Sequence, residues 1–146
     1  MLWKKKPSTC TMLPTRMIAE ASIPVRVVSL ANFRGHLHAR AKIVAQQRKD
    51  ARLVVRDLMA QIGHGYPQGC KITVISVILT RCGGRKLDSD NLVSAFKAVR
   101  DGVAEGLGVD DGDASVAWSC WQDLVEPQQT KIGIEFSFDG LLKWRP

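Results

Sequence analysis

The 146-residue sequence contains no run that approaches the roughly 18 consecutive apolar residues of a membrane-spanning helix. Its basic start, MLWKKK, is not followed by the apolar stretch of a secretory signal. We find no internal repeat and no low-complexity block, so a repeat architecture is excluded. We therefore expect a cytoplasmic protein with no membrane partner.

Cysteine and histidine are too sparse to indicate a metal site. The four cysteines are Cys10, Cys70, Cys82 and Cys120. No two of them have the spacing of a metal knuckle, and a chain of this length does not need disulfides for stability. We expect free thiols in a reducing compartment. His36 and His38 have no cysteine or acidic partner at a suitable spacing, so this pair is not expected to bind a metal.

Positive charge is abundant, with 21 Lys and Arg against 14 Asp and Glu and a net charge of +7. Such an excess favours a polyanionic partner, either nucleic acid or an anionic membrane surface. The length favours one domain that can bury its own core. We expect residues 1–20, which include Pro7 and Pro14, to form a flexible basic tail, and residues 21–146 to form the folded domain.

The first half of the folded domain shows a strand, a helix and a second strand. The range Ser22–Leu30 is rich in β-branched residues, and Pro24 places this strand at a sheet edge or delays its start. A helix is predicted over Ala39–Ile62, with an apolar stripe of Val44, Ala51, Val55, Leu58 and Ile62. The nearly continuous apolar run Lys71–Arg81 is typical of a central strand covered on both faces.

A second helix is predicted after Asp88, because Leu92, Phe96, Val99, Val103 and Leu107 recur at helical spacing and Gly108 follows them. Two strands, Ser115–Gln122 and Thr130–Phe138, come next and should form an antiparallel hairpin. The predicted order is β-α-β-α-β-β. The predicted fold class is α+β, with two helices packed on a mixed four-stranded sheet.

Aspartates gather at both ends of the second helix, with Asp88 and Asp90 before it and Asp110, Asp111 and Asp113 after it. One interpretation is structural: Asp88 or Asp90 caps the helix and complements its dipole, and the later group forms a polar turn. The other is catalytic. Converging carboxylates select Mg²⁺ or Mn²⁺, which can activate water and stabilise charge on a phosphoryl oxygen. A basic protein with one acidic metal site is the usual design of a nuclease.

The length of the second helix argues against a simple metal site in one chain. A helix of 20 residues is about 30 Å long, so it separates the two groups of aspartates. Asp110 and Asp111 reach Asp88 and Asp90 only if the helix is shorter than predicted or the following loop folds back. A second subunit of a dimer could also supply the missing group. The sequence leaves these alternatives open.

The segments LDSDNL and KAVRDGVAEGLGVDD resemble the RusA family of Holliday junction resolvases, which is common on prophages. The resemblance spans about Ser22 to Phe138, with a weaker match at SLANFRGHLHARAKIVAQQR. It implies a Mg²⁺-dependent endonuclease that acts as a homodimer in DNA recombination and repair. Such an enzyme resolves four-way DNA junctions by paired symmetric nicks.

The resemblance also assigns roles to single residues. Asp88 and Asp90 match the first metal ligands, and Asp111 matches the third acidic ligand, with Asp110 as its alternative. Lys97 is similar to the catalytic lysine, which stabilises phosphate charge. The family pattern places that lysine three residues after the Asn, where this chain has Ser94. Lys97 follows one turn later, and Arg100 is a less favoured substitute.

Other residues are expected to contact DNA. These are Arg85 and Lys86 before the aspartates, Asn32 and Arg34 after the first strand, and Lys42, Lys49 and Arg52 on the first helix. Trp118 and Trp121 are more often core or interface residues than stacking platforms. One competing hypothesis is a non-catalytic basic DNA- or RNA-binding protein. Another is a nuclease of the same fold that prefers flaps or forks.

Overall fold

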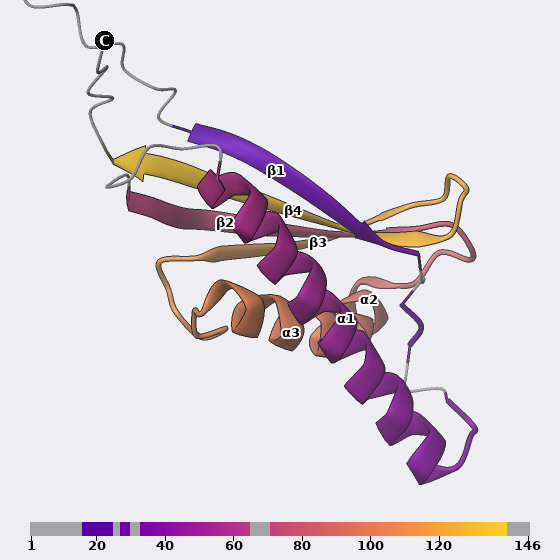
Figure 1. Cartoon of the computed structure of the whole chain (residues 1–146). Coiled ribbons are helices and arrows are strands. Elements are labelled where there is room, and N and C mark those ends of the chain that lie inside the picture. The colour runs from indigo at the N-terminus through magenta and orange to yellow at the C-terminus, as the bar shows by residue number, and fades with distance from the viewer. Residues whose placement is uncertain (1–15, 25–26, 30–32, 65–70, 140–146) are drawn as a thin grey trace, which may run out of the picture.

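The computed structural model describes residues 16–24, 27–29, 33–64 and 71–139 of the chain. Its elements are β1 (Arg16–Ile23), α1 (Leu37–His64), β2 (Lys71–Cys82), α2 (Ser89–Ala95), α3 (Lys97–Leu107), β3 (Ala117–Asp123) and β4 (Gln129–Asp139). Figure 1 shows the helices gathered on one side of a single sheet, with α1 crossing in front of α3. The predicted α+β fold with a mixed four-stranded sheet is confirmed. No helix in these ranges is long and apolar enough to cross a membrane.

The strand order is β1-β4-β2-β3, which contradicts the predicted hairpin between the last two strands. β4 is antiparallel to both β1 and β2, whereas β3 is parallel to β2 at the edge of the sheet. The burial of their side chains fits these positions in the sheet. Ile132, Ile134 and Phe136 of β4 are almost completely buried, as expected for a central strand. β3 is partly exposed along its length, as expected for an edge strand.

The first strand begins earlier than predicted, at Arg16 instead of Ser22, and it ends at Ile23. Proline lacks the N–H that a ladder requires, so the chain leaves the sheet at Pro24. Val27 is nevertheless buried, which shows that its apolar character serves the core. Residues 16–20, assigned to the tail, therefore belong to β1; the first 15 residues lie outside the described ranges. The edge position that Pro24 indicated is confirmed.

The predictions for the first helix and the second strand are confirmed almost to the residue. Ala51 and Val55 of the predicted stripe are fully buried, and Leu58 and Ile62 pack beside them. β2 is a central strand, between β4 and β3, as predicted, but the prediction that both of its faces are covered is wrong, because the described residues cover only one. Val77 and Leu79 are buried against the helices, while Thr73 on the other face is exposed.

The second predicted helix is broken into two, α2 and α3, at Phe96. Hydrogen bonds from Phe96 N to Leu92 O (3.2 Å) and from Arg100 N to Phe96 O (2.8 Å) continue through the break. The apolar stripe is retained, because Leu92, Phe96, Val99 and Val103 are all buried. Gly108 ends α3 in the left-handed conformation, as its position predicted (φ 69°).

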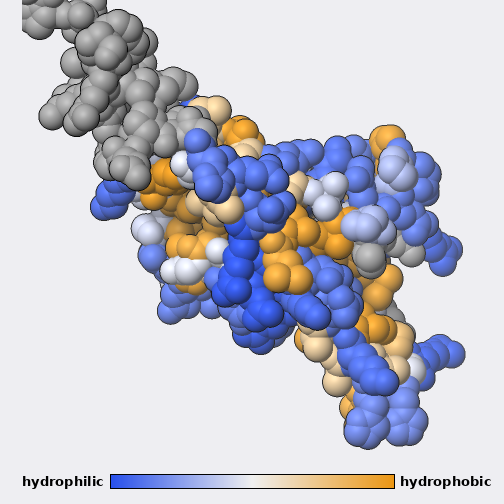
Figure 2. Space-filling model, viewed as in Figure 1, coloured by the Kyte–Doolittle hydropathy of each residue, from blue (hydrophilic) through white to orange (hydrophobic). Residues whose placement is uncertain are grey.

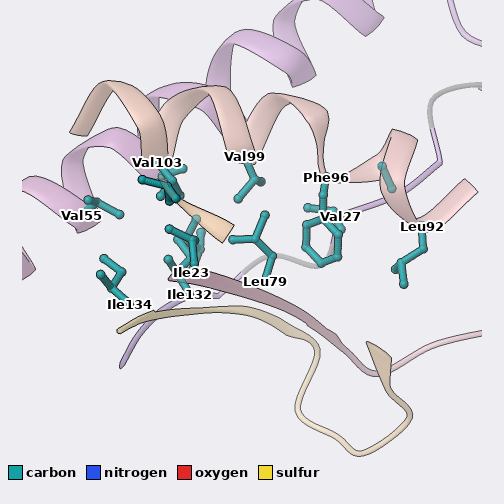
Figure 3. Close-up of a cluster of buried hydrophobic side chains, with 14 of the residues drawn as sticks. Ile23, Val27, Val55, Leu79, Leu92, Phe96, Val99, Val103, Ile132 and Ile134 are labelled. Atoms are coloured by element: carbon teal, nitrogen blue, oxygen red, sulfur yellow. The ribbon is translucent and has the colours of Figure 1, made fainter. Parts of the chain in front are cut away.

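The core fills the space between the helices and the sheet. In Figure 3, Val55 of α1 and Val99 and Val103 of α3 point toward Leu79, Ile132 and Ile134 of the sheet. Two glycines of α3 let the helices approach closely: a Cβ atom on Gly102 would lie 2.2 Å from the carbonyl oxygen of Arg48, and one on Gly106 would lie 2.9 Å from that of Arg52. α1 therefore fixes the position of α3.

Candidate functional site

The loop that leads to Asp88 is held by two side chains of the sheet, Arg81 of β2 and Gln122 of β3. Arg81 is only 3% exposed, and its guanidinium donates hydrogen bonds to the carbonyl oxygens of Val27 (2.9 Å), Gly83 (3.4 Å) and Arg85 (2.7 Å). Gln122 of β3 accepts a hydrogen bond from Leu87 N (2.9 Å) and donates one to Leu87 O (2.6 Å). The position of this loop is therefore set by β2 and β3.

Asp88 and Asp90 stand at the start of α2, and both are exposed. Asp88 is the N-cap: its Oδ1 accepts a hydrogen bond from Asn91 N at 2.9 Å. The side chain of Asn91 in turn accepts a hydrogen bond from Ser29 Oγ at 3.2 Å. The structural interpretation of Asp88 is thus confirmed, and Asp90 remains in the first turn with its carboxylate in solvent.

The aspartates after α3 form local turns. Asp110 Oδ1 accepts a hydrogen bond from Gly112 N (3.0 Å), and Asp113 Oδ1 accepts one from Ser115 N (2.9 Å). Hydrogen bonds from the backbone and side chain of Ser115 lower the pKa of Asp113. Asp111 is held through its backbone, because its carbonyl oxygen accepts a hydrogen bond from Arg100 Nη2 at 2.8 Å.

A hollow of about 380 Å³ lies beside the break between α2 and α3. Its lining includes Ser94, Lys97, Arg100, Asp101, Asp111 and Cys120. The structure thus brings together Lys97 and Asp111, two residues predicted for catalysis. It also adds Asp101, which lines a second, smaller hollow with Asp110 and Asp111. Asp88 and Asp90 line neither hollow.

The predicted metal ligands are not assembled within one chain. Among the described residues, no group of three or more His, Cys, Asp or Glu side chains is arranged to hold a metal ion. The physical reason is that α2 and α3 follow each other between Asp90 and Asp111. The carboxylates suit Mg²⁺ chemically, but a single chain does not complete a site with three carboxylates.

The cations predicted to contact DNA have different environments. Arg34, Lys42, Lys49, Arg85 and Lys86 are exposed, and Asn32 lies outside the described residues. Arg52 is half-buried, and its Nη1 lies 3.7 Å from Glu105 Oε2. Figure 2 shows hydrophilic side chains along α1, with hydrophobic ones on both sides of it. Arg52 therefore serves the α1–α3 contact, while the exposed cations are available to a partner.

Arg48 forms the main ion pair between α1 and α3. Its Nε donates a hydrogen bond to Glu105 Oε1 at 2.7 Å. This hydrogen bond raises the pKa of Arg48 and lowers the pKa of Glu105. The pair lies at the surface, so its contribution to stability is small.

The sequence alone gave little or no indication of the contacts that several residues near the hollow make. The guanidinium of Arg100 lies over Trp118, 4.8 Å from the ring centroid, and also holds Asp111. Burial raises the pKa of the nearby Cys120 thiol, and Arg100 partly offsets this effect. Trp118 packs against the core as expected, but Trp121 is 62% exposed. Arg81 and Gln122 gave no recognisable signal, because their partners are backbone groups distant in sequence.

No protein-family model matches this chain, and no curated protein matches it. Among solved structures, it is similar to a crystal structure of "a putative endoribonuclease" from Shewanella oneidensis MR-1. The TM-score is 0.49 and the sequence identity 12%, over 94% of this chain and 88% of that chain. Similarity at this level does not assign a function, so the proposal below depends on the residues of this chain.

Proposed function

We propose that this protein is a Mg²⁺-dependent endonuclease that resolves four-way DNA junctions by paired nicks. One observation carries the proposal: the exposed pair Asp88 and Asp90 stands at the start of α2, directly after a loop that the side chains of Arg81 and Gln122 fix to the sheet. Exposed carboxylates that only need solvation do not require such support. Fixed carboxylates beside exposed cations are the arrangement that metal-assisted cleavage of a phosphodiester requires.

In this proposal, Asp88 and Asp90 hold the metal ion, and Mn²⁺ can replace Mg²⁺. The ion supplies an activated water and neutralises charge on the phosphate. A second copy of the chain contributes its Asp111 or Asp110, because the described part of one chain does not unite these groups. The active form is therefore a homodimer, and its two-fold symmetry suits two opposed strands of a four-way junction.

The positive side chains have two roles. Lys97 is exposed and lines the same hollow as Arg100, so both can approach a phosphate there. Arg100 is also in contact with Asp111 and Trp118, which leaves Lys97 as the cation of this hollow that is free to turn toward a phosphate. Arg85 and Lys86 contact phosphates beside the aspartates, and Lys42 and Lys49 contact a DNA arm along α1. These contacts predict binding that weakens with salt.

A non-catalytic DNA- or RNA-binding protein is the second candidate, and the hydrogen bonds of the aspartates favour it. Asp88 caps α2, and Asp110 and Asp113 close local turns, so three of the five aspartates have structural partners. Under this hypothesis, the exposed cations bind the backbone and nothing is cleaved. A nuclease with the same residues but a preference for flaps or forks is a variant of the first proposal.

The test uses purified protein and a synthetic four-way junction with labelled arms, beside a flap and a linear duplex. We expect paired symmetric nicks in Mg²⁺, none in EDTA, and none for Asp90→Asn in Mg²⁺. Asp90→Asn should still bind the junction, because a negative group near the phosphates has been removed. Tight binding of the junction by the wild type, without cleavage in Mg²⁺ or Mn²⁺, would establish the binding protein instead.

Two further variants separate the charge of Asp88 from its cap. Asn is as good an N-cap as Asp, so Asp88→Asn should retain stability and lose cleavage. Asp88→Ala should lose cleavage and also about 1 kcal/mol of stability. Asp57→Asn is the matched control, since Asp57 is an exposed aspartate on α1 that accepts a hydrogen bond only from the neighbouring Gln61 among the described contacts. It should cleave like the wild type.

A further inference from the structure

The buried face of α1 contains one polar side chain, that of Gln47. The buried residues of this helix are Gln47, Ala51 and Val55, which follow one another at intervals of one turn. Gln47 is only 8% exposed, and its Oε1 has no hydrogen-bond partner. A buried carbonyl oxygen without a donor costs free energy, and such atoms are rare in native proteins. The place of Gln47 in an otherwise apolar stripe therefore needs an explanation.

Gln47 Oε1 differs from the other unpaired buried atoms of the described ranges. Those atoms are Arg52 Nε, Arg100 Nε and Trp118 Nε1. All three belong to partly exposed residues, and both guanidinium groups make other polar contacts. They are also donors, whereas Gln47 Oε1 is an acceptor in a residue that is less than a tenth exposed. A molecule that satisfies this oxygen must carry a hydrogen-bond donor.

Gln47 lines a pocket of about 190 Å³, which we call the Gln47 pocket. Its wall is mainly formed by four apolar side chains from three parts of the chain: Ile23, Val27, Ile43 and Val99. Figure 3 shows Ile23, Val27 and Val99 in the buried cluster between the helices and the sheet. An apolar cavity of about 150 Å³ is large enough to bind benzene. The Gln47 pocket can therefore take a single ring or a short hydrocarbon chain.

The charge in the Gln47 pocket selects the donor. Among the described residues that line it, Asp50 is the only charged one. Asp50 follows Gln47 by three positions, so the two side chains are neighbours on one face of α1. Asp50 Oδ1 accepts a hydrogen bond from Gln46 Nε2 at 2.7 Å, which leaves Oδ2 for a further donor. A primary ammonium group has three N–H donors and a positive charge, so it can serve both acceptors.

We propose that the Gln47 pocket binds a small primary amine whose apolar part is a single ring or a short hydrocarbon chain. The ammonium group donates hydrogen bonds to Gln47 Oε1 and to the carboxylate of Asp50, and the apolar part contacts Ile23, Val27 and Val99. A neutral ligand would leave the charge of Asp50 unpaired, and an anion would be repelled by it. None of the residues proposed for DNA cleavage lines this pocket, so the inference does not depend on that function.

The test measures binding of phenethylamine and of its neutral analogue phenethyl alcohol to the whole chain by isothermal titration calorimetry. Asp50→Asn keeps an oxygen for Gln46 and removes the charge, so it should bind the amine about 5- to 10-fold more weakly and the alcohol unchanged. Gln47→Met should bind the amine about 2- to 10-fold more weakly, because one acceptor is lost. Asp57→Asn is the matched control: Asp57 also accepts a hydrogen bond from a glutamine on α1, Gln61, but does not line the pocket.

Thermal unfolding without ligand gives an independent readout. Gln47→Met keeps the length of the side chain and removes the unpaired oxygen, so it should melt at the temperature of the wild type or above it. A lower melting temperature would show that the amide serves the fold, and would overturn the proposal. Failure of the wild type to bind phenethylamine, or equal affinity for the amine and the alcohol, would overturn it as well. So would binding of the amine by Asp50→Asn at the strength of the wild type.

Discussion

The two ends of the α2–α3 helix pair carry similar aspartates but are fixed to different parts of the fold. Asp88 and Asp90 follow a loop that Arg81 and Gln122 bind to β2 and β3. Asp111 follows α3, which rests on α1 through Gly102 and Gly106. The first pair is therefore attached to the sheet, and Asp111 is attached through α3 to α1.

The two groups also differ in how firmly their surroundings are held. The hydrogen bonds of Arg81 at the first end are charge-assisted and buried or partly buried, and such bonds contribute more than those of exposed turns. The turns of Asp110 and Asp113 are exposed and close within a few residues. The first end is thus the more firmly held half of the candidate site.

Gly102→Ala should break the attachment of the far end and have the largest effect. Its Cβ would meet the Arg48 carbonyl oxygen at 2.2 Å and the Ala51 Cβ at 2.9 Å, so α3 must move away from α1. We expect a loss of about 3 kcal/mol or more, measured by urea denaturation. Gly63→Ala is the control, because nothing lies within 4 Å of its added methyl group. A stable Gly102→Ala variant would show that the two helices do not pack this closely.

Arg81→Met should loosen the first end and leave the far end intact. The change leaves carbonyl oxygens of Val27, Gly83 and Arg85 without their donor, at a cost of about 2–3 kcal/mol. Hydrogen exchange should quicken in residues 83–88 and not in α3. Arg56→Met, an exposed change on α1, should stay within about 0.5 kcal/mol of the wild type. Equal exchange rates in both regions would contradict the separate attachment of the two ends.

Removing the ion pair of Glu105 with Arg48 should have the smallest effect on stability, and this effect should disappear in acid. Arg48 lowers the pKa of Glu105 below its unfolded value, so the pair stabilises the fold above roughly pH 4.5. This contribution is lost as the pH falls through the lower, folded pKa. Glu105→Gln should therefore flatten the pH dependence of the melting temperature in this range. Salt should shrink the difference between variant and wild type, whereas a salt-independent difference would mean that Glu105 acts through packing.

Local sequence patterns predicted where the helices and strands lie better than they predicted which strands pair. The apolar stripe of α1 and the stripe from Leu92 to Leu107 appear in the sequence because helical periodicity is a property of nearby residues. The break at Phe96 is not visible, since this residue belongs to the stripe on both sides. The hairpin prediction failed because β4 pairs with strands far away in the chain, and its burial decides its place.

In the candidate site, too, the sequence predicted what depends on neighbouring residues and not what depends on tertiary packing. The sequence by itself determined where carboxylates and cations occur along the chain, that Asp88 or Asp90 caps the second helix, and that this helix ends at Gly108, since each depends on residues within a few positions. Tertiary structure alone decided that Lys97 and Asp111 share a hollow, that Arg52 pairs with Glu105, and that Trp121 is exposed. These relations join residues from different elements, and close packing of the whole chain is what brings such elements together.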